Sequence, residues 1–253
     1  MISFNDFQCY LTHYTKNESR KRFMQNIFQA ENITDVYWIE KYDREELSYI
    51  DVYKQFKMNI NEWQTRQHNH FSPIFYPLKP EEVSLCLKHK EGMRHFLQES
   101  SKPYMFIMED DAMLAEGFKD VFDSHVKSLP GDWDVAFIGS GGGKRIPKSD
   151  LVEGTHWYKK AYPGDRCTDS ILFTKQAVKQ LYDNINDHRI AYPIDHELSF
   201  WMRNLKMNVY WLEPPIVTQG SQCGIFDTFQ DEMSGKFVDM NLPVRKDLKN
   251  ILG

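Results

Sequence analysis

The stretch "PYMFIMEDDAML", residues 103–114, joins an apolar run to three consecutive carboxylates. The apolar and aromatic residues 104–108 predict a buried β-strand. Glu109, Asp110 and Asp111 follow at its carboxyl end. In α/β proteins with an open parallel sheet, ligands bind at the carboxyl ends of the strands. The stretch therefore predicts either an acidic ligand site at a sheet edge or an acidic cap on the helix expected to follow.

The hydrophobic pattern around this strand predicts alternating strands and helices. Strands are expected at residues 7–14, 34–40, 103–110, 132–140 and 168–174, and one or two more within 207–219. Helices are expected within residues 16–33, 45–56, 79–100, 116–129, 175–185 and 193–205. The strand–helix–strand order favours an α/β fold with a mostly parallel central sheet.

The first of these helices is predicted from an apolar stripe. Phe23, Ile27 and Ala30 recur at spacings of four and three residues, which places them on one helix face. Arg20 and the neighbouring basic residues are then expected on the opposite, solvated face.

The chain of 253 residues suits one large domain or two small ones. Because no repeat or linker divides it, we expect a single domain over residues 1–253, with a core at about 7–222 and a loop-rich tail at 223–253. Residues 61–80 hold three prolines and predict a long loop of the kind that often forms lids or binding loops.

Composition excludes several classes of protein. The net charge is -5 and there is no basic stripe, so nucleic acid is not an expected partner. The cysteines have no C-x-x-C spacing and predict neither a zinc ribbon nor a disulfide framework, which fits reduced thiols in the cytoplasm. We expect no signal peptide and no transmembrane segment.

Two short motifs are set aside. "GSGGGKR", residues 139–145, is not a P-loop, because Ile138 stands where the first Gly belongs and Arg145 where Ser or Thr would bind Mg²⁺. We expect a flexible loop there. "HNH", residues 68–70, lacks partner cysteines and a nearby carboxylate pair, so a solvated loop is expected rather than a zinc or nuclease site.

The carboxylates have a chemical interpretation of their own. Side-chain alternation along a strand puts Glu109 and Asp111 on one side and Asp110 on the other. Such crowded carboxylates repel one another unless a cation lies between them, and hard oxygen ligands favour Mg²⁺ or Mn²⁺. These ions usually share their coordination with substrate phosphates, which predicts a phosphate-bearing ligand.

"PYMFIMEDDAML" also resembles the "ILEDDA" segment of family 25 glycosyltransferases, the group with lipooligosaccharide and procollagen galactosyltransferases. Further segments resemble family motifs in the same order and cover most of residues 7–222. They are "YLTHYTKNESRKRF", "LKPEEVSLCLKHKEGM", "GDWDVAFIGS", "TDSILFTKQAVKQLYDNI", "YPIDHELS" and "EPPIVTQGSQ". The chain departs from the second motif at Ser84, Leu85 and Lys88, where the family has Gly, Cys and Ser.

The resemblance implies a GT-A type nucleotide-sugar-binding fold. The acidic motif would hold Mn²⁺ or Mg²⁺ on the diphosphate of the donor, with Asp111 and Glu109 as metal ligands and Asp110 facing the donor ribose or sugar. Family members invert the anomeric centre, which needs one general base. Asp195 is the expected base and His196 and Glu197 are alternatives; equally, Asp195 is open to interpretation as the N-cap of a helix after Pro193.

The resemblance also implies residues that bind the nucleotide-sugar. Thr12 and His13 end the first strand, where a base or ribose would lie. His89 retains the family's histidine, and Lys88 is a candidate contact for phosphate. Gln219, with Ser221, matches a segment that closes over the donor in such folds.

The sequence thus predicts a metal-dependent, inverting glycosyltransferase, a hexosyl- or pentosyltransferase. It would move a sugar from a nucleoside-diphosphate sugar, first of all a UDP-sugar, to a glycan or glycoconjugate hydroxyl. It would act in the cytoplasm, with the cytosolic membrane face as the place to meet a glycolipid acceptor. The alternatives are a nucleotidyltransferase or sugar-nucleotide hydrolase with the same acidic site, and a non-catalytic glycan-binding protein.

Overall fold

The computed structural model describes residues 2–57, 78–141, 143, 145–164, 166–223, 225–226 and 251. Most of the expected loop at 61–80, the "HNH" segment and most of the expected tail lie outside the described residues. Within the described ranges, no helix has the length and apolar character that crossing a membrane requires.

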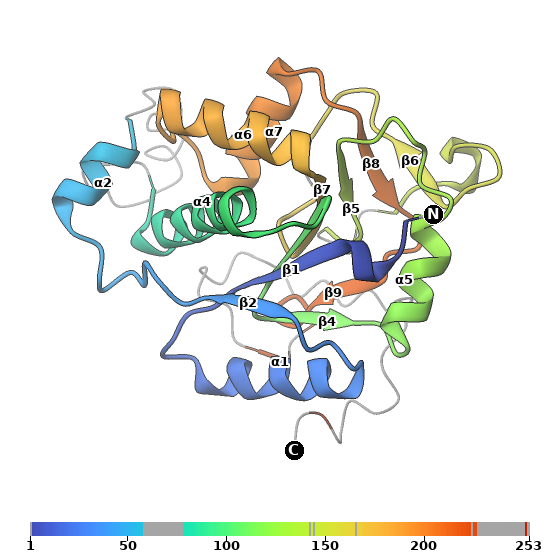
Figure 1. The fold of residues 1–253 in the computed structure, drawn as a ribbon, viewed down its shortest axis with the longest axis horizontal. Coiled ribbons are helices and arrows are strands. Elements are labelled where there is room, and N and C mark those ends of the chain that lie inside the picture. Colours follow the sequence, from blue (N-terminus) through green and yellow to red (C-terminus); the bar gives the residue numbers. More distant parts are fainter. Residues whose placement is uncertain are drawn as a thin grey trace.

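Seven strands of the described chain form one twisted sheet, in the order β2-β1-β3-β7-β5-β8-β6 (Figure 1). Strands β1, β2, β3, β5 and β8 run in the same direction, and β7 and β6 run against them. The expected α/β fold with a mostly parallel central sheet is confirmed. The strands are β1 (Phe7–Thr12), β2 (Val36–Ile39), β3 (Tyr104–Glu109), β5 (Val135–Phe137), β6 (Trp157–Lys159), β7 (Ser170–Thr174) and β8 (Val209–Leu212).

A second, two-stranded sheet follows the acidic stretch. Strand β4 (Ala112–Leu114) pairs antiparallel with β9 (Val217–Gln219), and Ala112 lies opposite Gln219. The next helix begins only at Phe118. The interpretation of the three carboxylates as a helix cap is therefore wrong, because a strand and not a helix follows them.

Helices cover both faces of the central sheet (Figure 1). α4, α6 and α7 pack together on one face, and α1 lies on the other, below β4. Each side encloses its own apolar cluster. The helices are α1 (Glu18–Ala30), α2 (Tyr49–Gln55), α4 (Pro80–Glu99), α5 (Phe118–Val126), α6 (Lys175–His188) and α7 (Ile194–Asn204), with 3₁₀ turns η1 (Phe4–Asp6) and η2 (Lys148–Asp150).

The central strands show why they are buried on both faces. In β1, Cys9 and Leu11 belong to the cluster beneath α1, while Tyr10 belongs to the cluster beneath α4. Period-two alternation directs apolar side chains to each face in turn, as expected for strands covered by helices on both sides. Gly92 lets α4 approach closely, since a Cβ there would lie 2.9 Å from the Ile39 side chain.

Candidate functional site

The acidic stretch lies at the carboxyl edge of the parallel strands. His13 follows β1, and Glu109 ends β3, its direct neighbour in the sheet. Strand β7 runs the other way, so its beginning, not its end, reaches this edge. Asp169 immediately precedes β7 and thereby joins the group. This edge is where open α/β sheets bind ligands.

Asp110 is fully engaged by protein donors. Its Oδ2 forms hydrogen bonds with His13 Nδ1 at 2.8 Å and with the backbone N–H of Tyr14 at 3.2 Å. Its Oδ1 accepts from an Arg20 guanidinium nitrogen at 2.8 Å. Burial alone would raise the pKa of Asp110, but the hydrogen bond from His13 and the charge of Arg20 hold it below its usual value. Asp110 is thus an ionised anchor between β1 and α1.

Arg20 is buried, which makes the predicted solvated position wrong. Only 8% of the residue is exposed, and its guanidinium lies 2.8 Å from Asp110 and 3.9 Å from Asp111. Arg20 stands three residues before Phe23 and seven before Ile27, so the same helical period that predicts the apolar stripe includes it. The sequence therefore held a signal that this arginine faces inward.

Glu109 holds two side chains in place. Its Oε1 accepts from the Thr168 hydroxyl at 2.5 Å, and its Oε2 accepts from the Gln219 amide at 3.2 Å. Burial, and then the charge of Asp111, raise the pKa of Glu109 to about 7. Glu109 nevertheless remains the partly exposed member of the acidic triplet, so solvent reaches the cluster from its side.

Asp111 has one oxygen bound and one unpartnered. Its Oδ2 accepts from the backbone N–H of Ser221 at 3.2 Å and from the Ser221 hydroxyl at 2.5 Å. Its Oδ1 is buried and has no hydrogen-bond partner. Burial raises the pKa of Asp111, although Arg20 opposes the shift. The β4–β9 pairing brings the segment with Gln219 and Ser221 onto the carboxylates.

Sequence reasoning missed a fourth carboxylate, Asp169. It is 0% exposed, and neither carboxylate oxygen has a hydrogen-bond partner. Burial and then the charges of Glu109 and Asp111 raise the pKa of Asp169 well above its usual range. Nothing in "CTDSILFT" distinguishes this aspartate from one that opens a strand. Only the pairing of β3 with β7 shows that it stands beside Glu109.

The glycine-rich stretch after β5 packs against the chain around Asp169. A Cβ on Gly139 would lie 2.2 Å from the Asp169 carboxylate oxygens, and one on Gly141 would lie 2.1 Å from Arg166 Cγ. Gly139, Ser140 and Gly141 are all buried. These glycines permit close approach of two chain segments.

Thr12, Lys88 and His89 lie beneath the edge. Thr12 donates its hydroxyl to the Met108 carbonyl at 3.4 Å. Lys88 is buried, and its ammonium donates to the carbonyls of His13 and Lys41 and to Asp43 Oδ1 at 2.7–2.8 Å, so it ties the ends of β1 and β2 together. His89 is fully buried with both ring nitrogens unpartnered, and burial lowers its pKa to about 3.

The acids of "PIDHE" lie in the first turn of α7. The N-cap is Pro193, so the interpretation of Asp195 as the N-cap is wrong. Asp195 is partly exposed, and its Oδ1 accepts from the backbone N–H of His196, which is itself exposed.

Glu197 differs from Asp195 in its surroundings. It is buried, and its carboxylate accepts from the backbone N–H groups of Ala191 and Tyr192 and from the Trp201 indole, at 2.8–3.1 Å. These bonds fasten the loop before α7 to the helix.

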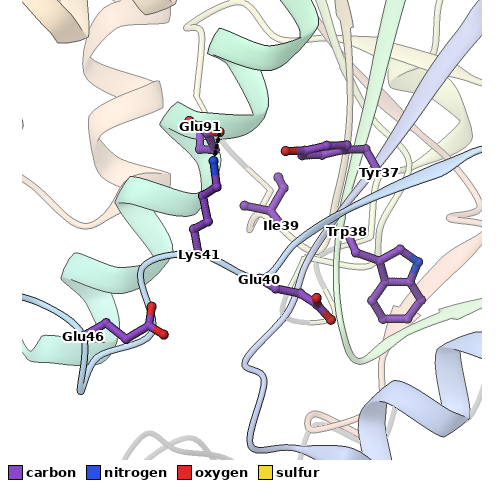
Figure 2. A pocket seen from close by; sticks show the side chains of 7 residues that line it. All are labelled: Tyr37, Trp38, Ile39, Glu40, Lys41, Glu46 and Glu91. Carbon is purple, nitrogen blue, oxygen red and sulfur yellow. Dashed lines mark hydrogen bonds and ion pairs between the residues drawn. The ribbon is translucent and has the colours of Figure 1, made fainter.

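A cavity of about 330 Å³ lies between β2 and α4 (Figure 2). Trp38 is part of its wall and meets the His13 ring edge-on, with ring centroids 5.6 Å apart. Lys41 reaches across to Glu91 at 3.4 Å (Figure 2). Its lining includes three carboxylates, Glu40, Glu46 and Glu91, and this one lysine.

The donor atoms fit a divalent cation in part. As they lie, the described residues contain no group of three His, Cys, Asp or Glu side chains that could hold a metal ion. Asp111 Oδ1 and both oxygens of Asp169, however, are buried oxygen donors without partners. Mg²⁺ and Mn²⁺ prefer oxygen, and Mg²⁺ usually binds through one or two carboxylates plus substrate phosphates. The residues therefore fit a cation shared with a phosphate.

No family model matches the chain, and no curated protein matches it. Among solved structures, the chain is similar to the 4-diphosphocytidyl-2C-methyl-D-erythritol synthase of Anaerococcus prevotii DSM 20548. The two share 11% sequence identity with a TM-score of 0.37, over 81% of this chain and 88% of that one. A likeness at that level carries no inference about activity.

Proposed function

We propose that this protein is a metal-dependent glycosyltransferase that uses a nucleoside-diphosphate sugar, first of all a UDP-sugar. The observation that carries the proposal is Asp111. Its carboxylate is buried at the carboxyl edge of the sheet beside Glu109, with Oδ1 unpartnered. A divalent cation bound there would relieve the repulsion between the carboxylates and attract a diphosphate.

The chain's own residues have distinct parts in this proposal. When bound, the cation would neutralise charge on the leaving nucleoside diphosphate. Asp110, held by His13 and Arg20, fixes the turn that carries Asp111. Gln219 and Ser221 hydrogen-bond Glu109 and Asp111, and in this proposal the segment that follows β9 encloses the donor.

Asp195 is the proposed general base on the acceptor side. It is partly exposed, whereas both oxygens of Glu197 are occupied by donors of its own helix and loop. A base must reach the acceptor hydroxyl, and an accessible carboxylate meets that condition better than a buried one. The reaction proposed is inversion, with one base and no covalent intermediate.

The proposal includes a glycan or glycoconjugate acceptor and a cytoplasmic location. The location rests on the cysteine spacing, which predicts no disulfide framework and suits a reducing compartment. Glycolipid at a membrane face is one form of acceptor within this proposal.

Calorimetric titration of UDP in the presence and absence of Mn²⁺ tests the proposal. We expect binding to the wild type to require Mn²⁺, and Asp111→Asn to weaken it by about tenfold or more, because even residues that only orient metal ligands contribute about 10–100-fold to metal affinity. Asp187→Asn, an exposed change on α6, is the matched control. Unchanged affinity and metal dependence in Asp111→Asn would refute the metal site.

The same acidic site would also serve a nucleotidyltransferase or a sugar-nucleotide hydrolase. Product analysis with a panel of UDP-sugars separates these reactions. Release of UDP that increases with an added glycan acceptor supports sugar transfer. Release of sugar 1-phosphate and UMP would instead identify cleavage within the diphosphate.

A further inference from the structure

Asp169 is a buried carboxylate that the protein leaves unsatisfied. The residue is 0% exposed, and neither oxygen has a hydrogen-bond partner. Ionised, it needs donors, and protonated, it needs an acceptor for its own hydrogen. Burial of an unpaired polar group costs free energy, and most buried polar groups in native proteins are paired. A cation bound at this carboxylate would satisfy it.

The sheet register shows where Asp169 points. Met108 of β3 lies opposite Ser170 of β7, and the Glu109 N–H donates to the Asp169 carbonyl at 3.2 Å, so Glu109 and Asp169 are opposite one another. Opposite residues of an antiparallel pair project to the same face, with Cβ atoms about 4.5–5.5 Å apart. Asp111 follows Glu109 by two residues, just beyond the carboxyl end of β3. The carboxylates thus share one small region at the sheet edge.

Gly139 makes the room for Asp169 on its other side. Phe137 of β5 lies opposite Ile171 of β7, and continuing this register places Gly139 opposite Asp169. A Cβ at position 139 would lie 2.2 Å from both carboxylate oxygens. Any other residue at 139 would displace the carboxylate, so the glycine and the aspartate form one arrangement.

Glu109 and Asp169 differ in what their oxygens already do. Glu109 accepts from Thr168 and from Gln219, one hydrogen bond at each oxygen. By contrast, both oxygens of Asp169 and the Oδ1 atom of Asp111 have no hydrogen-bond partner. We propose that Asp111 and Asp169 are the two carboxylates that bind the divalent cation, and that Glu109 is a positioning residue for Thr168 and Gln219. This deepens the proposed function and rests on it for the donor diphosphate that completes the coordination.

Mn²⁺ binding to the full-length chain tests the assignment without any measurement of activity. Free Mn²⁺ is followed by electron paramagnetic resonance during titration of the metal-stripped protein, with MnCl₂ alone and with UDP added. We expect Asp169→Asn to weaken Mn²⁺ binding by about tenfold or more, since even outer-shell residues contribute about 10–100-fold. Glu109→Gln should weaken it less than Asp169→Asn does, and Asp187→Asn should match the wild type.

A second variant tests the geometry rather than the ligand chemistry. Gly139→Ala keeps every oxygen donor but places a methyl group where the Asp169 carboxylate lies, so it should weaken Mn²⁺ binding as Asp169→Asn does. Thermal unfolding without metal reports on folding. Because burial raises the pKa of Asp169 and its oxygens have no hydrogen-bond partner to lose, Asp169→Asn should leave the metal-free melting temperature close to that of the wild type.

Several outcomes would overturn the inference. If Asp169→Asn binds Mn²⁺ as tightly as the wild type, Asp169 is not a ligand. If Glu109→Gln loses more Mn²⁺ affinity than Asp169→Asn does, Glu109 and not Asp169 is the second ligand. No Mn²⁺ binding by the wild type, alone or with UDP, would remove the cation site altogether. The proposed function fails separately: Mn²⁺ bound through Asp169 with no affinity for any UDP-sugar refutes that function and leaves the cation site standing. Mn²⁺-dependent UDP binding that survives in Asp169→Asn would refute Asp169 as a cation ligand and leave the proposed function standing.

Discussion

His89 lies within α4 with neither ring nitrogen hydrogen-bonded. Burial lowers its pKa from 6.5 to about 3, and no neighbouring charge contributes to the shift. At a pH between these two pKa values, His89 is protonated in the unfolded chain and neutral in the folded chain. The folded state is therefore fully favoured above about pH 6.5 and loses stability as the pH falls towards 3. His89 makes the protein sensitive to mild acid.

Replacing His89 with leucine should remove this sensitivity. Between pH 7 and pH 5 the wild type should lose about 2 kcal/mol more unfolding free energy than His89→Leu, because one pKa unit corresponds to about 1.36 kcal/mol. Urea denaturation followed by tryptophan fluorescence at both pH values measures the difference. Phe96→Leu, a buried change in the same helix, should alter stability equally at both pH values. Equal acid losses in wild type and His89→Leu would contradict the prediction.

Two residues show where sequence reasoning at the residue scale succeeds and stops. Arg20 continues the helical spacing of Phe23 and Ile27, so its inward direction could have been predicted had charge not been taken as a sign of exposure. Asp169 could not have been predicted. It meets Glu109 only because β3 and β7 pair, and that contact joins residues 60 positions apart.

The first turn of α7 holds two acids with different environments. Glu197 is buried and fastens the preceding loop through Ala191, Tyr192 and Trp201. Asp195 is partly exposed in the same turn. Acidic residues are generally favoured there, because the helix N-terminus carries partial positive charge. We therefore expect Glu197 to contribute to stability and Asp195 to contribute to catalysis.

Paired substitutions test this division of roles. Glu197→Gln should lower stability by about 1–3 kcal/mol, since an amide cannot accept at both of the carboxylate's positions. Asp195→Asn should leave stability nearly unchanged but lower turnover by roughly 10²–10⁴-fold, with UDP affinity retained. Urea denaturation, and UDP release from the tightest-binding UDP-sugar, provide the measurements. Turnover lost in Glu197→Gln and kept in Asp195→Asn would exchange the two roles.

At the scale of elements, the longer and more periodic segments were predictable. The strand expected at 103–110 is β3, and the helix expected at 79–100 is α4. The three-residue strands β4 and β6 were not, because they are too short to show alternation and no longer apolar run marks them. Of these two strands, β4 has the larger effect on the site. It follows Asp111 directly and pairs with β9, and this pairing brings Ser221 to the carboxylates.

At the scale of the whole molecule, the carboxylates sit where separate parts of the chain converge. β1, β3, β5, β7 and β9 each end or begin beside them, and the residues concerned range from His13 to Ser221. A ligand bound at this edge contacts segments from nearly the full length of the described chain. Its binding free energy should therefore stabilise the fold as a unit and not one loop alone.

Thermal unfolding with UDP and Mn²⁺ should reveal this linkage. A ligand that binds only the folded state at 100 times its Kd adds about 2.7 kcal/mol. For a chain of this size, that corresponds to a rise in Tm of roughly 5–10 °C. UDP with EDTA should produce almost no rise, because the cation is needed to hold the diphosphate among carboxylates. Asp111→Asn should abolish the rise with Mn²⁺ while keeping a metal-free Tm close to that of the wild type. An equal rise in EDTA would mean that UDP binds away from the carboxylates, and the acidic edge would then need another ligand.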